Sequence, residues 1–523
     1  MSDLFLGIDI GTSGCKALLL DRTGSVRGVA TSEYPLSTPR PLWAEQNPHD
    51  WWQGACSAIR GATAIAKASG GDVVCIGLTG QMHGLVLLDA KGEPLRPAIL
   101  WNDQRTSAEC EEIHSRVKGG RERVIAITGK PALPSFTSPK VLWVRKHEPE
   151  IHRRAAHLLL PKDYVRLRLT GTQAIDVADG SGTGLLDVTR RTWSDEITDA
   201  LEIPTTWLPQ VFESPAICAK VHAAGASATG LREGTPVVAG AGDQAAEAVG
   251  LGAVRDGEVS VAIGTSGVVF VSFNSPRIDP KGRLHAYCHA FAGGWHMMGV
   301  MLSAGGSLRW YRDTLGGEER IEAAKRGVDP YEIITQQAAT APAGCEGLIF
   351  LPYLTGERTP HADPFARGAF IGLTLRHGKA HMARAIIEGV TYGLLDCLNL
   401  VRDLGLQVRS VRVSGGGARS AFWRQMLADV FNADVATVNA TQGAAMGAAI
   451  LASVGAGAYS SVDAACAALV HETGRTAPGA SAAIYSSYAE RYRSLYQSLK
   501  PEFQAIARAC TCLLYTSPSP RDS

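Results

Sequence analysis

The pentapeptide Ile-Gly-Thr-Ser-Gly occurs twice in this chain, at residues 10–14 and again at residues 263–267. Glycine lets the backbone approach a ligand closely, and the threonine and serine hydroxyls add hydrogen-bond donors, so this turn is suited to binding phosphate oxygens. A purely structural hairpin is the alternative. The repetition about half a chain apart favours a repeated architecture, in which two such turns bind one nucleotide between them.

The two copies differ in the residue before the turn, which is Asp9 in the first and Ala262 in the second. A carboxylate beside a phosphate loop repels the anion unless a divalent cation lies between them. Mg²⁺ is bound through one or two carboxylates, waters and substrate phosphates. Asp9 is therefore the candidate metal ligand, and a turn-capping aspartate is the alternative.

A second carboxylate follows an apolar strand and a Gly-Ala-Gly turn, at Asp243, immediately before an Ala-rich segment. Strand carboxyl ends open onto the crevice that α/β folds use for ligands. An aspartate at this place could accept a proton from an attacking hydroxyl. From spacing alone, a purely structural Asp243 that N-caps a helix beginning at Gln244 is equally supported.

Two polar clusters also follow apolar runs, Gly-Gln-Met-His-Gly at residues 80–84 and Trp-Asn-Asp-Gln-Arg at residues 101–105. Amide, imidazole, carboxylate and guanidinium groups beside Trp and Met suit a polyhydroxylated substrate, which needs several hydrogen bonds and an apolar wall. Taken singly, His83 is more often a structural histidine and Trp101 more often a core residue.

Alternating apolar runs and amphipathic stretches indicate which elements position these residues, and the alternation is typical of an α/β fold. Each glycine turn is predicted to join two strands. Strands are expected at residues 4–10, 15–20, 73–78, 84–88, 259–263, 268–273 and 408–413, and helices at residues 48–68, 379–404 and 481–509. Small residues dominate residues 443–452 and predict close helix packing.

A chain of 523 residues exceeds the size at which one hydrophobic core keeps growing, which predicts two large domains. We expect them at residues 1–247 and 258–509, joined by a hinge at residues 248–257. Asp243 and both glycine turns are expected to converge on the cleft between them. Residues 510–523 change composition abruptly and resemble translated adaptor sequence, so they are predicted to be a non-native tail.

Composition excludes several classes of function. A formal net charge of +1 gives no basic surface for nucleic acid. The 11 cysteines lack the paired spacings of a zinc site and indicate reduced thiols. No export signal and no apolar stretch long enough to span a membrane is recognisable, so we expect a cytoplasmic protein without a membrane partner.

These motifs together resemble the FGGY family of carbohydrate kinases, in a match that spans residues 4–505. The matching segments are residues 7–14, 80–84, 97–103, 136–143, 159–164, 239–245, 351–361 and 414–419. So many matches in the same order make the resemblance specific. It implies two actin-like ATPase domains of the ribonuclease H type, with the sugar held mainly by the N-terminal domain and ATP mainly by the C-terminal one.

The resemblance also implies roles for single residues. Asp243 would be the catalytic base, and Asp9 would support Mg²⁺ and the phosphates, with ATP and Mg²⁺ as cofactors. The implied sugar contacts are Gln81, Met82, His83, Trp101, Asp103, Asp243 and Gln244. The implied phosphate and nucleotide contacts are Gly11, Thr12, Ser13, Gly264, Thr265, Ser266, Gly306, Gly415, Gly416 and Gly417.

The implied reaction is phosphorylation of D-xylulose by ATP to D-xylulose 5-phosphate. A homodimer is an expectation at the level of the family only. Gln244 stands where related pentulose kinases carry Asn and glycerol kinases carry Gln, so ribulose, L-xylulose and glycerol stay open as acceptors. An actin-like ATPase module without sugar kinase activity is the alternative from another class. The small-molecule loops at residues 80–84 and 101–105 oppose it.

Overall fold

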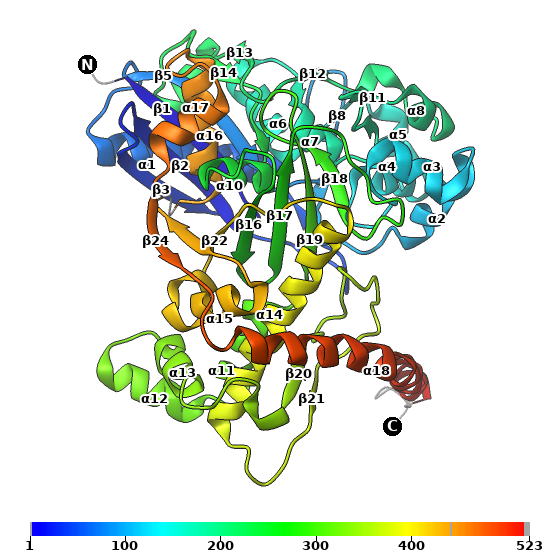
Figure 1. The fold of residues 1–523 in the computed structure, drawn as a ribbon. Helices are drawn as coiled ribbons and strands as arrows, with labels where there is room; N and C mark the ends of the chain where they lie inside the picture. The colour runs from blue at the N-terminus through cyan, green and yellow to red at the C-terminus, as the bar shows by residue number, and fades with distance from the viewer. Residues whose placement is uncertain (1–2, 440–441, 517–523) are drawn as a thin grey trace, which may run out of the picture. The chain divides into compact units, whose positions relative to one another are not determined.

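The structure is a computed structural model that describes residues 3–439 and 442–516. Its mixture of helices and strands confirms the predicted α/β class (Figure 1). By internal contacts the chain divides into two compact units. Unit 1 comprises Met1–Glu258, Val271–Met297 and Val438–His471, and unit 2 comprises Val259–Phe270, Met298–Thr437 and Glu472–Ser523. The expected boundaries at residues 247 and 258, and the hinge between them, stay predictions.

The main sheet of unit 1 has seven strands in the order β13-β14-β5-β1-β2-β3, with β15 also paired to β5. The strands are β1 (Leu4–Ile10), β2 (Gly14–Asp21), β3 (Val26–Glu33), β5 (Val73–Gly80), β13 (Ile217–Lys220), β14 (Pro236–Val238) and β15 (Ala241–Gly242). β1 and β2 are antiparallel, which confirms the first predicted strand, turn and strand. β5 runs parallel to both β1 and β15, so these three strands end at the same edge.

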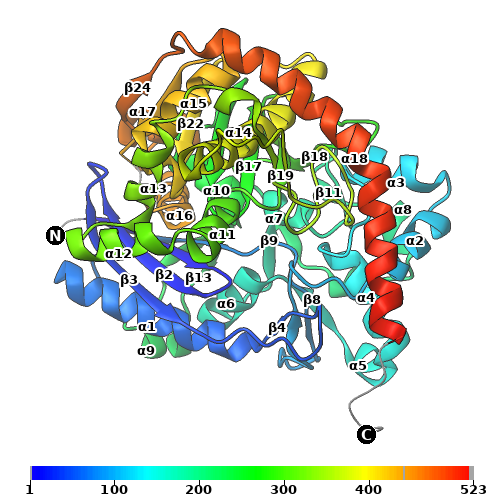
Figure 2. The same cartoon turned by 90° about the horizontal axis from the view of Figure 1, so that it is seen from below.

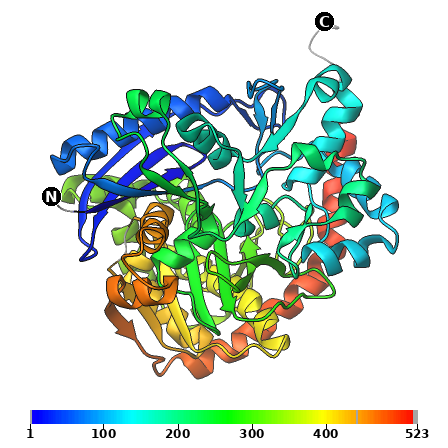
Figure 3. The ribbon, with the colours of Figure 1, turned by 90° about the horizontal axis from the view of Figure 1, so that it is seen from above.

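The strands β1 and β2 send alternate side chains into two different hydrophobic cores, as the period of two requires. One core joins Leu6 and Ile8 to Trp51 of α1 (Pro48–Ala66), and the other joins Phe5 and Leu18 to α16 (Ala444–Gly455). The two helices accordingly lie on opposite faces of these strands (Figures 2 and 3).

The close packing predicted for the small residues of α16 is confirmed. A Cβ added to Gly7 of β1 would lie 2.0 Å from the carbonyl oxygen of Ala445, and one added to Gly77 of β5 would lie 2.1 Å from that of Ala448. Glycine in the strands and alanine in the helix therefore let backbone approach backbone.

The second large sheet also has seven strands, in the order β18-β19-β17-β16-β22-β23-β24. The strands are β16 (Glu258–Ile263), β17 (Gly267–Phe273), β18 (His285–Cys288), β19 (Trp295–Met301), β22 (Ser410–Ser414), β23 (Val435–Val438) and β24 (Glu472–Thr476). β16 and β17 confirm the second predicted strand, turn and strand. Five two-strand pairs complete the described β-structure: β4 (Glu45–Gln46) with β7 (Ala98–Ile99), β6 (Val86–Leu88) with β8 (His157–Leu159), β9 (Ala174–Asp176) with β12 (Gln210–Phe212), β10 (Leu186–Asp187) with β11 (Thr192–Trp193), and β20 (Ile349–Leu351) with β21 (Ala369–Ile371).

Helices accompany the sheets in both units. Besides α1 and α16, unit 1 contains α2 (Ser107–Arg116), α3 (Gly120–Thr128), α4 (Thr137–His147), α5 (Pro149–Arg154), α6 (Pro161–Thr170), α7 (Val177–Ser181), α8 (Asp195–Ala200), α9 (Ala223–Thr229), α10 (Asp243–Gly250) and α17 (Val462–Leu469). Unit 2 contains α11 (Gly305–Thr314), α12 (Gly317–Arg326), α13 (Pro330–Ala338), α14 (Lys379–Asp403), α15 (Ala421–Phe431) and α18 (Ala482–Thr516).

The long predicted helices are confirmed as α1, α14 and α18; the ends of α1 and α14 differ by one or two residues from the prediction, whereas α18 continues to Thr516 rather than residue 509. Within the described ranges, no helix has the length and apolar character needed to cross a bilayer. The predicted non-native tail begins inside α18, whose backbone runs to Thr516, and residues 517–523 lie outside the described residues.

Candidate active site

The two predicted catalytic carboxylates lie at the carboxyl ends of strands that flank β5 in unit 1. Asp9 of β1 and Ala241 of β15 are both paired with Thr79 of β5. Because neighbouring strands are about 4.8 Å apart, the backbones of Asp9 and Ala241 are about 10 Å apart across β5. Asp243 follows two residues later, where the chain leaves the sheet. The structure thus brings Asp9 and Asp243 together, although they are far apart in the sequence.

Asp243 is the first residue of α10, and the N-cap position belongs to Gly242. The structural alternative in which Asp243 N-caps a helix beginning at Gln244 is therefore wrong. A Cβ on Gly242 would lie 2.8 Å from Cγ of Met82, so glycine is needed before the carboxylate for α10 to begin beside the Gly80–Gly84 turn.

The environment of both carboxylates favours their protonated forms. The pKa of Asp243 is raised to about 7, mainly by burial and also by the charges of Asp9 and Glu247, against the opposing effect of hydrogen bonds from Gln244. Burial also raises the pKa of Asp9 to about 6, against the attraction of Lys16. A carboxyl group with a pKa near neutrality is suited to accept a proton from an alcohol at physiological pH.

The first glycine turn is held by an internal hydrogen bond and by residues from two other segments. The backbone N–H of Gly11 donates to the carbonyl of Gly14 over 3.0 Å, and the Tyr34 hydroxyl donates to the carbonyl of Gly11 over 2.6 Å. Thr12 Oγ1 donates to Oε1 of Gln81 over 3.2 Å. Ser13 is exposed at the tip of the turn. These contacts position the turn of the first pentapeptide beside the polar cluster at residues 80–84.

Trp101 contacts this turn and is partly exposed to solvent. Its indole Nε1 donates to Thr12 Oγ1 over 3.0 Å, and 36% of the residue is exposed. A half-exposed indole with its polar edge bound offers its face as an apolar wall. This observation supports the predicted role of Trp101 beside a ligand rather than in the core.

Gln81, Met82 and His83 lie close together in the buried turn between β5 and β6. The backbone N–H of Gln81 donates to the carbonyl of Ile10, the residue after Asp9, over 2.8 Å. Nδ1 of His83 donates to the carbonyl of Gly182 over 2.7 Å. The turn is therefore attached to the strand end that carries Asp9.

Asp103 is fully buried, and its carboxylate is occupied within the protein. Arg105 forms an ion pair with it at 2.6 Å, and the backbone N–H groups of Ala44 and Arg105 donate to it over 2.7 and 2.9 Å. These contacts hold the loop that follows Trp101. Direct contact of Asp103 with a sugar stays a prediction, as does that of Gln244, which is partly exposed next to Asp243.

Gln46, which no motif in the sequence indicated, connects the first glycine turn to the polar cluster at residues 80–84. Its Nε2 donates to the carbonyl of Thr12 over 2.6 Å, and its Oε1 accepts from Nε2 of Gln81 over 2.9 Å and from Nε1 of Trp51 over 3.0 Å. Nothing in the local sequence signals this role, because all three partners are brought to Gln46 by tertiary packing.

The predicted nucleotide contacts gather around Ile263 in unit 2. The N–H of Gly264 donates to the carbonyl of Ser266 over 3.0 Å, and the N–H of Gly306 donates to the carbonyl of Thr265 over 3.0 Å. A Cβ on Gly415 would lie 2.5 Å from the carbonyl oxygen of Ile263, whereas one on Gly416 would face open space. The second glycine turn, the start of α11 and the Gly415–Gly417 segment are thus neighbours within one unit.

These groups suit a nucleotide phosphate. The first turn of α11 presents the positive end of the helix dipole, while its N–H groups at Gly305, Gly306 and Ser307 donate to the carbonyl groups of Gly264, Thr265 and Ala304. Arg309 Nη2 donates to Thr265 Oγ1 over 3.0 Å, which places a cation beside the turn. That these residues bind the nucleotide, and that they converge with the unit 1 carboxylates on a shared cleft, both stay predictions.

Asp9 has the features expected of a cation ligand. Its Oδ1 is buried and has no hydrogen-bond partner within the described residues, and Asp243 and Glu247 add negative charge nearby. Mg²⁺ takes one or two carboxylates and completes its shell with waters and phosphate oxygens. The residues therefore fit Mg²⁺. No group of three or more protein ligands occurs in the described ranges, so the chain would supply only part of the coordination.

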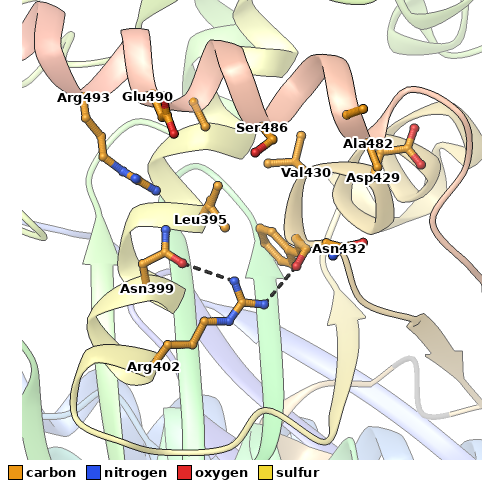
Figure 4. A pocket seen from close by; sticks show the side chains of 13 residues that line it. Leu395, Asn399, Arg402, Asp429, Val430, Asn432, Ala482, Ser486, Glu490 and Arg493 are labelled. Carbon is orange, nitrogen blue, oxygen red and sulfur yellow. Dashed lines mark hydrogen bonds between the residues drawn. The ribbon is translucent and has the colours of Figure 1, made fainter.

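Two pockets lie elsewhere in the units. One, of about 500 Å³, is lined by residues 38–44 and Asn102 in unit 1. The other, of about 370 Å³, lies among α14, α15 and α18 in unit 2 (Figure 4). In it, Arg402 donates to Asn399 and to the carbonyl of Phe431, and Arg493 is paired with Asp396. Neither pocket contains a predicted catalytic residue.

Comparisons with known proteins agree with this arrangement. The N-terminal domain model of the FGGY family of carbohydrate kinases matches residues 4–250, and the C-terminal domain model matches residues 259–456. The xylulose kinase of Escherichia coli is 42% identical over 500 residues, which cover 95% of this chain and 99% of that protein. The xylulose kinase of Bacillus subtilis is 39% identical over 95% of this chain and 97% of its own length. The crystal structure of xylulose kinase from Rhodospirillum rubrum superposes with a TM-score of 0.88 at 31% identity, covering 96% of this chain and 100% of that one.

Proposed function

Because the chain belongs to the FGGY family of carbohydrate kinases, we propose that it transfers the γ-phosphoryl group of ATP to the terminal hydroxyl of D-xylulose, giving D-xylulose 5-phosphate and ADP. The family supports ATP as phosphoryl donor, and the high identity and coverage of the relatives supports the acceptor. The observation that supports the chemistry is the position of Asp243, a half-buried residue directly after β15 whose carboxyl pKa is raised to about 7.

In this mechanism Asp243 accepts the proton of the acceptor hydroxyl as the oxygen attacks the γ-phosphorus. The transition state of phosphoryl transfer is loose, so positioning and charge neutralisation contribute most of the rate. In the proposal, the Thr12 and Ser13 hydroxyls and the amides of the first glycine turn would hold equatorial phosphate oxygens, and Thr12 would exchange its bond to Gln81 for one to a phosphate. Asp9 would hold Mg²⁺, which supplies neutralisation of the phosphate charge.

We propose that the acceptor binds among the residues near Asp243. Trp101 would offer an apolar wall against the carbon chain, and Met82, His83 and Gln244 would orient the hydroxyls. The nucleotide is proposed to bind at the second glycine turn, with Gly306 and Gly415–Gly417 near the phosphates and the adenosine. Free thiols at the described cysteines favour a reducing, cytoplasmic compartment.

A second acceptor class is suggested by Gln244. The Gln side chain is one methylene group longer than that of Asn, so its amide lies farther from the backbone next to Asp243. A longer amide would shorten the space available to the acceptor, which favours glycerol or another small polyol over a five-carbon ketose. The identity of the relatives over nearly the full chain favours the ketose.

Steady-state kinetics with coupled detection of ADP test the proposal. D-xylulose, D-ribulose, L-xylulose and glycerol are compared as acceptors, with Mg²⁺ and after its removal by EDTA. We expect the highest kcat/KM with D-xylulose and loss of turnover without Mg²⁺. A higher kcat/KM with glycerol would transfer the assignment to the second class. ATP hydrolysis that is independent of any sugar, accompanied by polymerisation, would contradict both and indicate an ATPase module.

A further inference from the structure

His83 lies in a backbone conformation that needs support. Its φ is +70°, in the left-handed region that residues other than glycine rarely adopt. Such a conformation persists when neighbouring groups hold it, and it is common beside ligands. His83 belongs to the turn that carries Gln81 and Met82, so the same support determines where these side chains point.

The carbonyl oxygen of His83 accepts two hydrogen bonds from one helix. Nζ of Lys140 donates to it over 2.8 Å, and Oγ1 of Thr137 donates to it over 3.1 Å. Both donors belong to α4, which begins at Thr137. Lys140 also donates to the carbonyl of Ser135 over 2.8 Å, so its ammonium group joins the start of α4 to the His83 turn.

The imidazole of His83 is held separately from its backbone. Nδ1 donates to the carbonyl of Gly182, and the ring edge meets Phe136 at a centroid distance of 4.9 Å. A Cβ on Gly182 would lie 2.8 Å from Nδ1, so the ring has little freedom. Lys140 therefore acts on the path of the backbone, whereas Gly182 and Phe136 act on the side chain.

Burying the ammonium group of Lys140 at this position costs free energy. It is fully buried, and in the described part of the chain it forms no ion pair with a carboxylate. Burial lowers its pKa to about 7, which the negative charge of Asp103 only partly offsets. An apolar side chain of similar length would cost less free energy to bury. The contribution of the lysine must therefore lie in the carbonyl groups that its ammonium binds.

We propose that Lys140 is a positioning residue of the kinase site, which holds the Gln81-Met82-His83 turn in its acceptor-binding conformation by donating to the carbonyl of His83, with Thr137 as a second, weaker donor. This inference rests on the proposed function, because it assigns that turn to the acceptor. It predicts that Lys140 contributes to affinity for the sugar and not to affinity for ATP.

The test compares Lys140→Met with Lys130→Met. Lys130 is a matched control, since it is also fully buried, has a pKa that burial lowers to about 7, and donates to two carbonyl groups, those of Thr128 and Ala286. We expect Lys140→Met to raise the KM for D-xylulose about tenfold, with an unchanged KM for ATP and an equal or higher Tm. Lys130→Met should leave the KM for D-xylulose at its wild-type value.

A second measurement needs no acceptor. Hydrogen–deuterium exchange of the peptide that covers residues 80–85 should be faster in Lys140→Met than in the wild type, and unchanged in Lys130→Met. Unchanged exchange would overturn the proposal even if the wild-type enzyme prefers another acceptor. Equal effects of both substitutions, or a loss of Tm together with kcat, would overturn it in favour of a merely structural role. If exchange accelerates but D-xylulose is not phosphorylated, the proposed acceptor fails and the positioning role stands.

Discussion

The charge of Asp9 raises the pKa of Asp243, although the strands that carry these residues do not pair with each other. Both strands pair with β5, which places the two carboxylates at one edge of the sheet. Two acidic groups with a shared electrostatic environment titrate together, so removing either charge changes the proton affinity of the other.

Replacing Asp243 by Asn should abolish turnover and stabilise the protein at alkaline pH. The proton acceptor is lost, so kcat should fall by about 10³-fold, with ATP binding retained. The pKa of Asp243 is raised in the folded state from its usual 3.8 to about 7, so the folded state binds the proton more tightly than the unfolded chain. Wild-type stability therefore declines as the pH rises from about 4 to about 7.

The Asn variant has no such decline. We expect its advantage over the wild type to be absent near pH 4 and to grow to at most about 4 kcal/mol above pH 7, from a shift of about 3 pKa units. Thermal denaturation at pH 4 and pH 8 measures this difference. Near-normal phosphorylation by the Asn variant would refute the assignment of the base.

Replacing Glu247 by Gln should move the pH dependence of the reaction. The negative charge of Glu247 raises the pKa of both Asp243 and Asp9, so its removal lowers both values. In the wild type, kcat/KM should decrease below about pH 7 as Asp243 becomes protonated. In Glu247→Gln the acidic limb should lie at a lower pH, by a fraction of a unit, with little change in the plateau. Two superimposable pH profiles would show that Asp243 does not control the limb.

Replacing Trp101 by Phe should reduce kcat/KM about fivefold, the effect expected from loss of one hydrogen bond while the apolar wall remains. The bond concerned joins indole Nε1 to Thr12 Oγ1. Trp295→Phe is the matched control, because its buried Nε1 donates to the carbonyl of Val188 over 2.7 Å, away from the site. The control should lower Tm without a selective effect on kcat/KM. An equal loss of kcat/KM in both variants would contradict a local role for Trp101.

Replacing Gly7 by Ala should destabilise the protein by more than about 3 kcal/mol, because the new methyl group would overlap the backbone of α16. The contact would be 2.0 Å, with a carbonyl oxygen rather than a flexible side chain. Gly317→Ala provides the contrast, since its Cβ would meet nothing within 4 Å at the start of α12. That variant should be unchanged or slightly more stable. Differential scanning calorimetry measures the Tm of both variants. A wild-type Tm for Gly7→Ala would contradict the close packing of β1 against α16.

Most of the local structure around the site could be predicted from the sequence. The apolar runs on each side of the two pentapeptides predict the strands β1, β2, β16 and β17, and the structure confirms them. The small residues of α16 predict its close approach to β1 and β5. These features follow from periodicity and residue size, which act over a few neighbours in the chain.

The functional meaning of Asp243 could not be obtained from spacing alone. Its position before an Ala-rich helix left a base and an N-cap equally supported, and the structure assigns the cap position to Gly242 instead. Likewise, a lone Trp101 resembles a core residue in the sequence, yet its indole is half-exposed and bound to Thr12. Such distinctions depend on burial, which local composition does not determine.

By itself, the sequence determined which candidate functional groups the chain carries and which family it resembles. The groups are a duplicated glycine turn, a carboxylate before one copy of it, and a second carboxylate after a strand end. The family resemblance spans most of the chain. Only the tertiary structure decided which of these groups meet and what holds them. Gln46 and Lys140 show this clearly, since each binds groups on distant segments and neither lies in a local pattern that indicates its partner. The physical reason is that elements arise from short-range periodicity, whereas the partners of buried polar groups are chosen by packing between segments far apart in the chain.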